Sequence, residues 1–118
     1  MRSTTVLNIV FVAGGMALAG CGGAPVPAED VTQSKAAISA AEAVGAQSVP
    51  NAALYLKMAK DNVAKAESLI KDGNNEEANL FLLEAQSDAE LSLSLAREEG
   101  MKQQASEAMK KVETLKKH

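Results

Sequence analysis

The stretch "PNAALYLKMAKDNVAKAESLIKDGNNEEANLFLLEAQSDAELSLSLA", residues 50–96, decides the fold, because its apolar residues follow a helical period on both sides of one glycine turn. In its first half an apolar residue recurs every three or four positions, as in a heptad seam: Leu56, Ala59, Val63, Ala66 and Ile70. Every second member of the seam is alanine, which lets a neighbouring helix approach closely. Because proline is accommodated at the first helical position, the pattern predicts a helix from Pro50 to about Lys71.

The segment that follows predicts a tight turn into another helix. Gly73 suits the left-handed position just past a helix end. Asn74 or Asn75 is expected to cap the next helix, and Glu76 and Glu77 lie where the helix dipole favours negative charge. The two helices are therefore expected to form an antiparallel hairpin.

The third helical stretch is the longest, from about Glu76 to Lys116, with Gly100 as the one candidate break. If continuous it reaches about 60 Å, against about 33 Å for the second helix, an overhang of about 25 Å. A stripe of mostly small residues is expected to face the other helices: Ala78, Leu82, Ala85, Ala89, Ser92 and Ala96.

A second apolar stripe runs along another side of this helix. Four leucines form its first part, Leu80, Leu83, Leu91 and Leu95, and its continuation beyond Gly100 is Met101, Ala105, Ala108, Val112 and Leu115. On an ideal helix Ala105 lies about 40° from Leu91 but about 140° from Leu82, so the distal part continues the leucine side. Two interpretations stay open: the stripe is further core, or it contacts a second copy of the chain or another protein.

Upstream of the hairpin, residues 31–44 have the period of a first helix, which Gly45 ends. Its inward positions are Val31, Ile38 and Ala41, with Ser34 filling the gap. The sequence therefore predicts an all-α fold in residues 31–118: a three-helix antiparallel bundle with coiled-coil-like packing and an elongated C-terminal helix, whose distal part is residues 101–117.

The first 21 residues, "MRSTTVLNIVFVAGGMALAGC", have the order of a secretory signal peptide, a basic start followed by an apolar run. The run from Val6 to Leu18 is shorter than the roughly 20 residues that a membrane-spanning helix needs. Leu18, Ala19, Gly20 and Cys21 resemble the lipobox of bacterial lipoproteins. An ordinary secreted protein or an uncleaved helix is the alternative.

The lipobox resemblance implies a lipid anchor. Residues 1–20 would be removed by a signal peptidase that recognises Leu18, Ala19 and Gly20, and the only cysteine, Cys21, would carry the acyl chains, two or more of which hold a protein stably on a membrane. Residues 21–30 then form the lipidated cysteine and a flexible tether. The implied location is the cell envelope, facing the periplasm. Gly22 stands where enteric lipoproteins kept in the inner membrane carry aspartate, which favours the outer membrane.

Charge is segregated along the chain. Residues 67–99 hold nine acidic and two basic residues, and residues 101–118 hold five basic and two acidic ones. The net charge of the whole chain is −3, which does not indicate a nucleic-acid binder. The segregation is expected to be a solvated surface, or else a basic end that contacts anionic lipid, cell-wall polymer or an acidic partner.

The residues do not indicate an enzyme. There is one cysteine, the only histidine is His118 and no glycine-rich phosphate loop is present, so no cofactor, metal or catalytic site is expected. Asp88 is the acid that lies nearest the small-residue stripe, and it is interpreted as a polar residue at the bundle edge.

Residues 34–97 resemble the bacterial domain of unknown function 4398. The features that carry the resemblance are Gly45-Ala46, Pro50, Gly73-Asn74 and Asp88-Ala89-Glu90, while Val49 stands where alanine is usual and Asn74 where aspartate is usual. The resemblance implies an alanine-rich helical fold and a cell-envelope lipoprotein, and it assigns no chemistry. The role that we expect from the second apolar stripe and the anchor is structural or protein interaction, with a homo-oligomer or another envelope protein as partner.

The alternative function is a peptide-binding helical module. The stretch "LIKDGNNEEANLFLLEA", residues 69–85, is similar to the turn of a tetratricopeptide hairpin. Only one such unit is visible, whereas a stable array needs about three.

Overall fold

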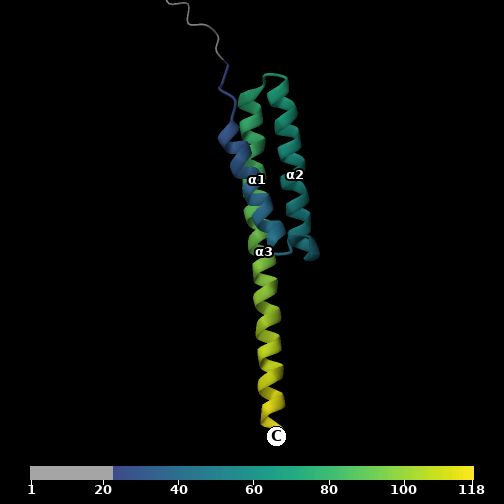
Figure 1. Cartoon of the computed structure of the whole chain (residues 1–118). Helices are drawn as coiled ribbons and strands as arrows, with labels where there is room; N and C mark the ends of the chain where they lie inside the picture. The colour runs from purple at the N-terminus through teal and green to yellow at the C-terminus, as the bar shows by residue number, and fades with distance from the viewer. Residues whose placement is uncertain (1–22) are drawn as a thin grey trace, which may run out of the picture.

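The computed structural model describes residues 23–118, and in these residues it contains three α-helices and one short 3₁₀ helix. The elements are α1 (Ala28–Ala43), η1 (Ala46–Ser48), α2 (Pro50–Lys71) and α3 (Asn75–Lys116). Consecutive helices run antiparallel and pack side by side, and α3 then continues beyond the other two as a single rod (Figure 1). The predicted all-α, three-helix antiparallel fold with an elongated C-terminal helix is confirmed.

Helix α1 begins at Ala28, three residues before the expected Val31. The early start has two physical causes. Buried Pro27 accepts the first backbone bond, from Val31 N–H to its carbonyl oxygen at 3.0 Å, and Glu29 and Asp30 lie in the first turn, where the helix dipole favours negative charge. The end of the segment expected to be a flexible tether is therefore helical.

The α1–α2 connection contains η1, which the sequence did not predict. Gly45 follows the end of α1 in the left-handed conformation, with φ +79°, and its N–H donates to the carbonyl of Glu42 at 2.9 Å. Ala46 then begins η1 and is completely buried. A three-residue helix is too short to leave a periodic signal in the sequence.

The α2–α3 turn is a Schellman motif. Gly73 has φ +79°, its N–H donates to the carbonyl of Ile70 at 3.1 Å, and Asn74 N–H donates to the carbonyl of Leu69 at 2.8 Å. Asn74 occupies the N-cap position of α3, but its side chain makes no capping hydrogen bond, so the expected amide cap is absent there. The Asn75 side chain instead donates from Nδ2 to the carbonyl of Ala24 at 2.9 Å.

The core lies where the predicted stripes meet. All six members of the α3 small-residue stripe are buried, and so are the first four members of the α2 seam. The fifth predicted member, Ile70, packs against the core but is only partly buried, and its neighbour Leu69 is the buried residue there, at 6% exposure. The chain turns directly after these residues, which brings Leu69 inside, while Ile70 borders a surface hollow beside Val26 and Val31 at the start of α1.

Two buried serines tie the three helices together. Ser34 Oγ of α1 donates to the carbonyl of Leu82 in α3 at 3.0 Å, and Ser92 Oγ of α3 donates to the carbonyl of Ala52 in α2 at 2.7 Å. Both serines are completely buried, so each hydroxyl needs such a partner. A hydroxyl that reaches the backbone of a neighbouring helix requires a close approach, which the alanines beside it permit.

Ion pairs fix α1 against α2 on the surface. Lys35 pairs with Glu67, and Glu42 pairs with Lys60, so each pair joins one residue of α1 to one of α2 in antiparallel register. These side chains are about half exposed, and such pairs add little free energy of folding. They are consistent with α1 lying over the α2–α3 hairpin.

Candidate functional site

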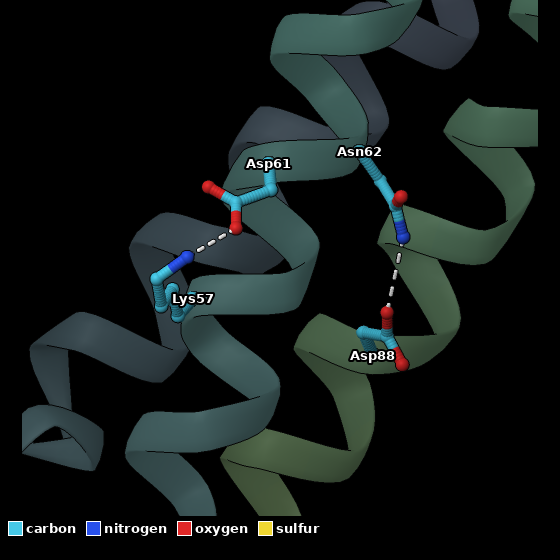
Figure 2. A network of polar contacts seen from close by, with 4 residues as sticks. All are labelled: Lys57, Asp61, Asn62 and Asp88. Atoms are coloured by element: carbon cyan, nitrogen blue, oxygen red, sulfur yellow. Dashed lines mark hydrogen bonds and ion pairs between the residues drawn. The ribbon is translucent and has the colours of Figure 1, made fainter.

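The described residues, 23–118, contain no group of three or more histidine, cysteine, aspartate or glutamate side chains placed to hold a metal ion. Polar contacts on α2 and between α2 and α3 are drawn in Figure 2. These contacts are the Lys57–Asp61 ion pair along α2 and a hydrogen bond from Asn62 Nδ2 of α2 to Asp88 Oδ2 of α3 at 3.2 Å. Asp61 and Asn62 point to different sides of α2, so the two contacts do not converge on one place (Figure 2).

Asp88 is partly buried, and its environment raises the pKa of its carboxyl group above the ordinary value. The main cause is loss of solvation, with repulsion from Glu84 one helical turn away as the second, while the hydrogen bond from Asn62 acts in the opposite direction. Asp88 thus joins α3 to α2 at the edge of the bundle, as the sequence interpretation had it.

The end of α3 has a surface with many exposed apolar side chains. We call residues 101–117 the distal segment. All five residues predicted there as a contact stripe are exposed: Met101, Ala105, Ala108, Val112 and Leu115. Met101, Val112 and Leu115 are 63%, 51% and 68% exposed, and the neighbouring Met109 is 73% exposed.

Helix α3 is continuous through Gly100, so the distal segment extends the proximal half in one line (Figure 1). The last buried residue of α3 is Ala96, and every residue from Met101 onward is exposed. The interpretation that the distal stripe is further core of the bundle is therefore wrong within a single chain, because α1 and α2 end before they reach it.

The leucine stripe of the proximal half is largely exposed as well. Leu80, Leu83 and Leu91 are 64%, 50% and 42% exposed, and only Leu95 is half-buried against the core. On an ideal helix Leu91 and Val112 lie about 160° and 140° from the buried Ala89, and about 60° from each other. We call this side of α3, which faces away from α1 and α2, the outer face.

A surface hollow follows one side of the distal segment. It is lined by residues that all lie between Lys102 and Lys116, and therefore by one helix alone. It is a flank of that helix and has no opposite wall within the described residues. Among the basic side chains here, Lys102 pairs with Glu98 at 2.7 Å and Lys117 with Glu113 at 3.0 Å, whereas Lys111 and Lys116 form no ion pair in the described part of the chain.

The predicted lipidation residue Cys21 and the predicted signal-peptidase residues Leu18, Ala19 and Gly20 lie outside the described residues. The first described residue, Gly23, borders a hollow with Gly73 and Asn75, so the chain enters the bundle beside the α2–α3 turn. The C-terminus lies at the opposite end of α3 (Figure 1). No helix within residues 23–118 has the length and apolar character to cross a bilayer.

Sequence reasoning identified the distal stripe and the small-residue stripe but gave no role to the two buried serine hydroxyls. A serine in a row of alanines indicates tight packing, yet the carbonyl that its hydroxyl reaches depends on the neighbouring helix. Of the lysines beside the distal stripe, Lys111 entered only as part of the net charge of the C-terminal region, and Lys116 also as a charge that complements the helix dipole.

A family model described as a domain of unknown function, DUF4398, matches residues 29–111, which include α2, all but the first residue of α1, and α3 as far as Lys111. Val112 and Leu115 of the distal stripe lie beyond the matched residues. Comparison with curated proteins and with solved structures gave no match.

Proposed function

The chain belongs to the DUF4398 family, and on that premise we propose that it is a lipid-anchored cell-envelope protein that acts through contacts of its distal segment and not through chemistry. The observation that carries the proposal is the exposed apolar stripe on a continuous helix beyond the bundle. Its members recur at intervals of four and three residues, which is the spacing of a helix that packs against another helix. A large exposed apolar surface of this kind is typical of an interaction site.

The proposed anchor is Cys21, on the basis of the lipobox that precedes it. Gly23 lies at the α2–α3 turn, so the anchor would enter at the end of the bundle away from the distal segment. Helix α3 has 42 residues and is about 63 Å long at 1.5 Å per residue. The interaction surface would thus be held away from the point at which its own chain is attached, within the periplasm, and Gly22 favours the outer membrane as the site of attachment.

The anchor is tested by metabolic labelling with a fatty-acid analogue. The full chain is expected to incorporate label and to lose residues 1–20, and the Cys21→Ser variant is expected to stay unlabelled and uncleaved, as mass spectrometry of the purified proteins would show. Label retained on the serine variant would overturn the lipid-anchor part of the proposal.

The contact surface is tested by crosslinking in intact cells. The double variant Val112→Asp with Leu115→Asp, and a chain ending after Gly100, are expected to lose the crosslinked species of the wild type while keeping the thermal midpoint of the bundle. The matched control is Gln103→Asp with Ser106→Asp, which has the same spacing and added charge, but lies about 140–160° around the helix from the midline of the stripe. Unchanged crosslinks in both test variants would show that the distal segment is not the contact surface.

The peptide-binding alternative has less support. In a tetratricopeptide-like module the groove beside the helical hairpin must be open to a ligand. Here α1 lies over the α2–α3 hairpin, with Ser34 bonded to α3 and Lys35 paired with α2. The hairpin face is therefore occupied by the chain itself.

A further inference from the structure

The outer face of α3 is divided into two halves of different character. Its heptad positions contain leucine, glutamate and serine in the proximal half and only aliphatic residues or methionine in the distal half: Leu80, Glu84, Ser87, Leu91, Ser94 and Glu98, then Met101, Ala105, Ala108, Val112 and Leu115. Neither half is covered by α1 or α2, which pack on the opposite side. Any partner of the outer face must therefore match a continuous apolar stripe in the distal half and leucines that alternate with polar residues in the proximal half.

The charges of the two halves are opposite. Residues 75–100 of α3 hold seven acidic residues and one basic residue, whereas residues 101–118 hold five basic and two acidic residues. Beside the distal stripe lie Lys102, Lys111 and Lys116, and the two distal glutamates, Glu107 and Glu113, lie further from it around the helix. Beside the proximal leucines lie Glu84 and Glu90, both exposed.

These charges favour one arrangement of two copies. If two distal segments pack on each other, or if two α3 helices pair in parallel, lysines face lysines and glutamates face glutamates, which is unfavourable at the flanks of a helix pair. If two α3 helices pair antiparallel, each basic distal segment lies on the acidic, leucine-bearing half of the other copy. Both apolar halves are then covered at once, and the two-fold symmetry closes the assembly at a dimer.

We propose that a second copy of this chain is the partner, bound antiparallel along the outer face of α3 so that each distal segment packs on the other copy's exposed leucines, Leu80, Leu83 and Leu91. This inference deepens the proposed function, since it rests on the distal segment being a contact surface. The bundles lie on the outer sides of the dimer, where α1 and α2 do not obstruct the pairing. The two chain entries at the α2–α3 turns would lie at opposite ends, about 60 Å apart.

The test is cysteine crosslinking between two differently tagged copies of the full chain in the same cells. One copy carries Leu80→Cys, the other Val112→Cys, and a short bismaleimide reagent is added. The mixed pair is expected to give a crosslinked heterodimer, and either variant paired with itself is expected to give none. Both sites are exposed, so the substitutions should leave the bundle folded.

Two controls define the background. Wild-type chains, whose only cysteine is Cys21, should give no crosslink with this reagent. Thr114→Cys paired with Leu80→Cys places the second thiol at an exposed site about 160° around the helix from Val112 and should give much less heterodimer. Crosslinks between two Val112→Cys copies would indicate parallel pairing, or packing of one distal segment on another, and would overturn the proposal, as would the absence of any crosslink between copies.

Charge reversal tests the contact itself. In the register that places Leu80 opposite Val112, Lys102 lies opposite Glu90, and Lys111 lies within one helical turn of the position opposite Glu84. Lys102→Glu with Lys111→Glu is therefore expected to abolish the heterodimer crosslink, and adding Glu84→Lys with Glu90→Lys to the same chain is expected to restore it. Failure of the second pair to restore the crosslink would overturn the antiparallel register. If copies never crosslink but Val112→Asp with Leu115→Asp still removes a crosslink to a different protein, this inference fails while the proposed function stands. If only the fatty-acid labelling experiment failed, the lipid anchor would be wrong, but the proposal of an antiparallel dimer would stand.

Discussion

The two halves of α3 are one helix with similar residues in different surroundings. In the proximal half Ala78, Ala85 and Ala89 are completely buried, whereas in the distal half Ala105 and Ala108 are exposed. Both halves carry apolar residues at helical spacing, so the period alone does not decide which of them is buried. The difference arises because α1 and α2 cover the proximal half and no described residue covers the distal one. Burial is thus decided by the partner that a face meets.

In the proximal half the small alanine side chains allow neighbouring helices to pack closely together. An alanine side chain buries little apolar area, but it lets two backbones come close enough for a serine hydroxyl of one helix to reach a carbonyl of the next, as Ser92 and Ala52 do. In the distal half the same residue has nothing to approach. Substitutions that are identical in kind should therefore have different effects in the two halves.

The largest expected difference comes from enlarging an alanine. Ala59→Leu or Ala85→Leu should lower the free energy of unfolding by about 1–3 kcal/mol, since each side chain is completely buried at a helix contact. Ala105→Leu in the distal half should cause no such loss. Thermal and urea unfolding followed by circular dichroism, on chains beginning at Gly22, would measure this. Equal midpoints for Ala85→Leu and Ala105→Leu would remove the distinction between the halves.

Glycine to alanine should give effects of opposite sign at the two ends of the proximal half. Gly73 has φ +79°, a conformation that costs an L-residue about 1–2 kcal/mol, so Gly73→Ala should destabilise the fold. Gly100 lies inside the helix with open space around its α-carbon, and Gly100→Ala should stabilise the helix by about 0.5–1 kcal/mol. The same unfolding measurements apply, and a loss of stability with Gly100→Ala would mean that the helix is not continuous there.

Removing a buried hydroxyl should have a smaller effect. Ser92→Ala deletes the bond to the Ala52 carbonyl and should cost about 0.5–1.5 kcal/mol of unfolding free energy. Ser94→Ala is the matched control on the same helix, because its hydroxyl is exposed and bonds within the helix to the carbonyl of Glu90. A comparable loss in both variants would show that the interhelical bond contributes nothing specific.

The smallest expected effect concerns pH. Because its folded environment raises the pKa of Asp88, the folded chain binds this proton more tightly than the unfolded chain. The contribution of Asp88 to the free energy of unfolding should therefore increase as pH falls through its raised pKa and decrease as pH rises. Asp88→Asn should be slightly more stable than the wild type at neutral pH, and the difference in free energy of unfolding between the two proteins should become smaller in acid. If this difference in free energy of unfolding became larger in acid, the result would contradict the direction of the pKa shift.

Much of the bundle could be predicted because it is periodic. The six buried positions of α3, and Ser34, Ile38 and Ala41 of α1, all follow from helical spacing. Spacing alone could not predict that Leu69, and not Ile70, is the buried residue at the end of α2. The chain turns directly after these residues, and the turn decides which of the two faces the core. The start of α1 at Ala28 could not be predicted from the sequence either. The preceding stretch contains two prolines and has little periodicity, so it gives no helical pattern that could be recognised without the rest of the bundle.

The contact surface on the outer face of α3 could be predicted only in part from the sequence. Spacing located the stripe from Met101 to Leu115, but the same spacing fits core and exposed surface equally. The structure decides between these two, since no described residue packs on the stripe. The proposal of a second copy needed a further step, the comparison of which charges flank each half of the outer face. Lys111 and Glu84 lie far apart in one chain, and only an antiparallel neighbour brings such residues together.

Amide hydrogen exchange across a range of protein concentrations tests the central claim most directly, that the distal segment needs a second copy and the bundle does not. At high dilution residues 28–96 are expected to exchange slowly, while residues 101–116 exchange fast, because a helical extension of this length is marginal without packing. As concentration rises, protection should appear in the distal segment and along the exposed leucines, with the core unchanged. Protection of the distal segment that is independent of concentration, whether as strong as the core or absent throughout, would contradict the account.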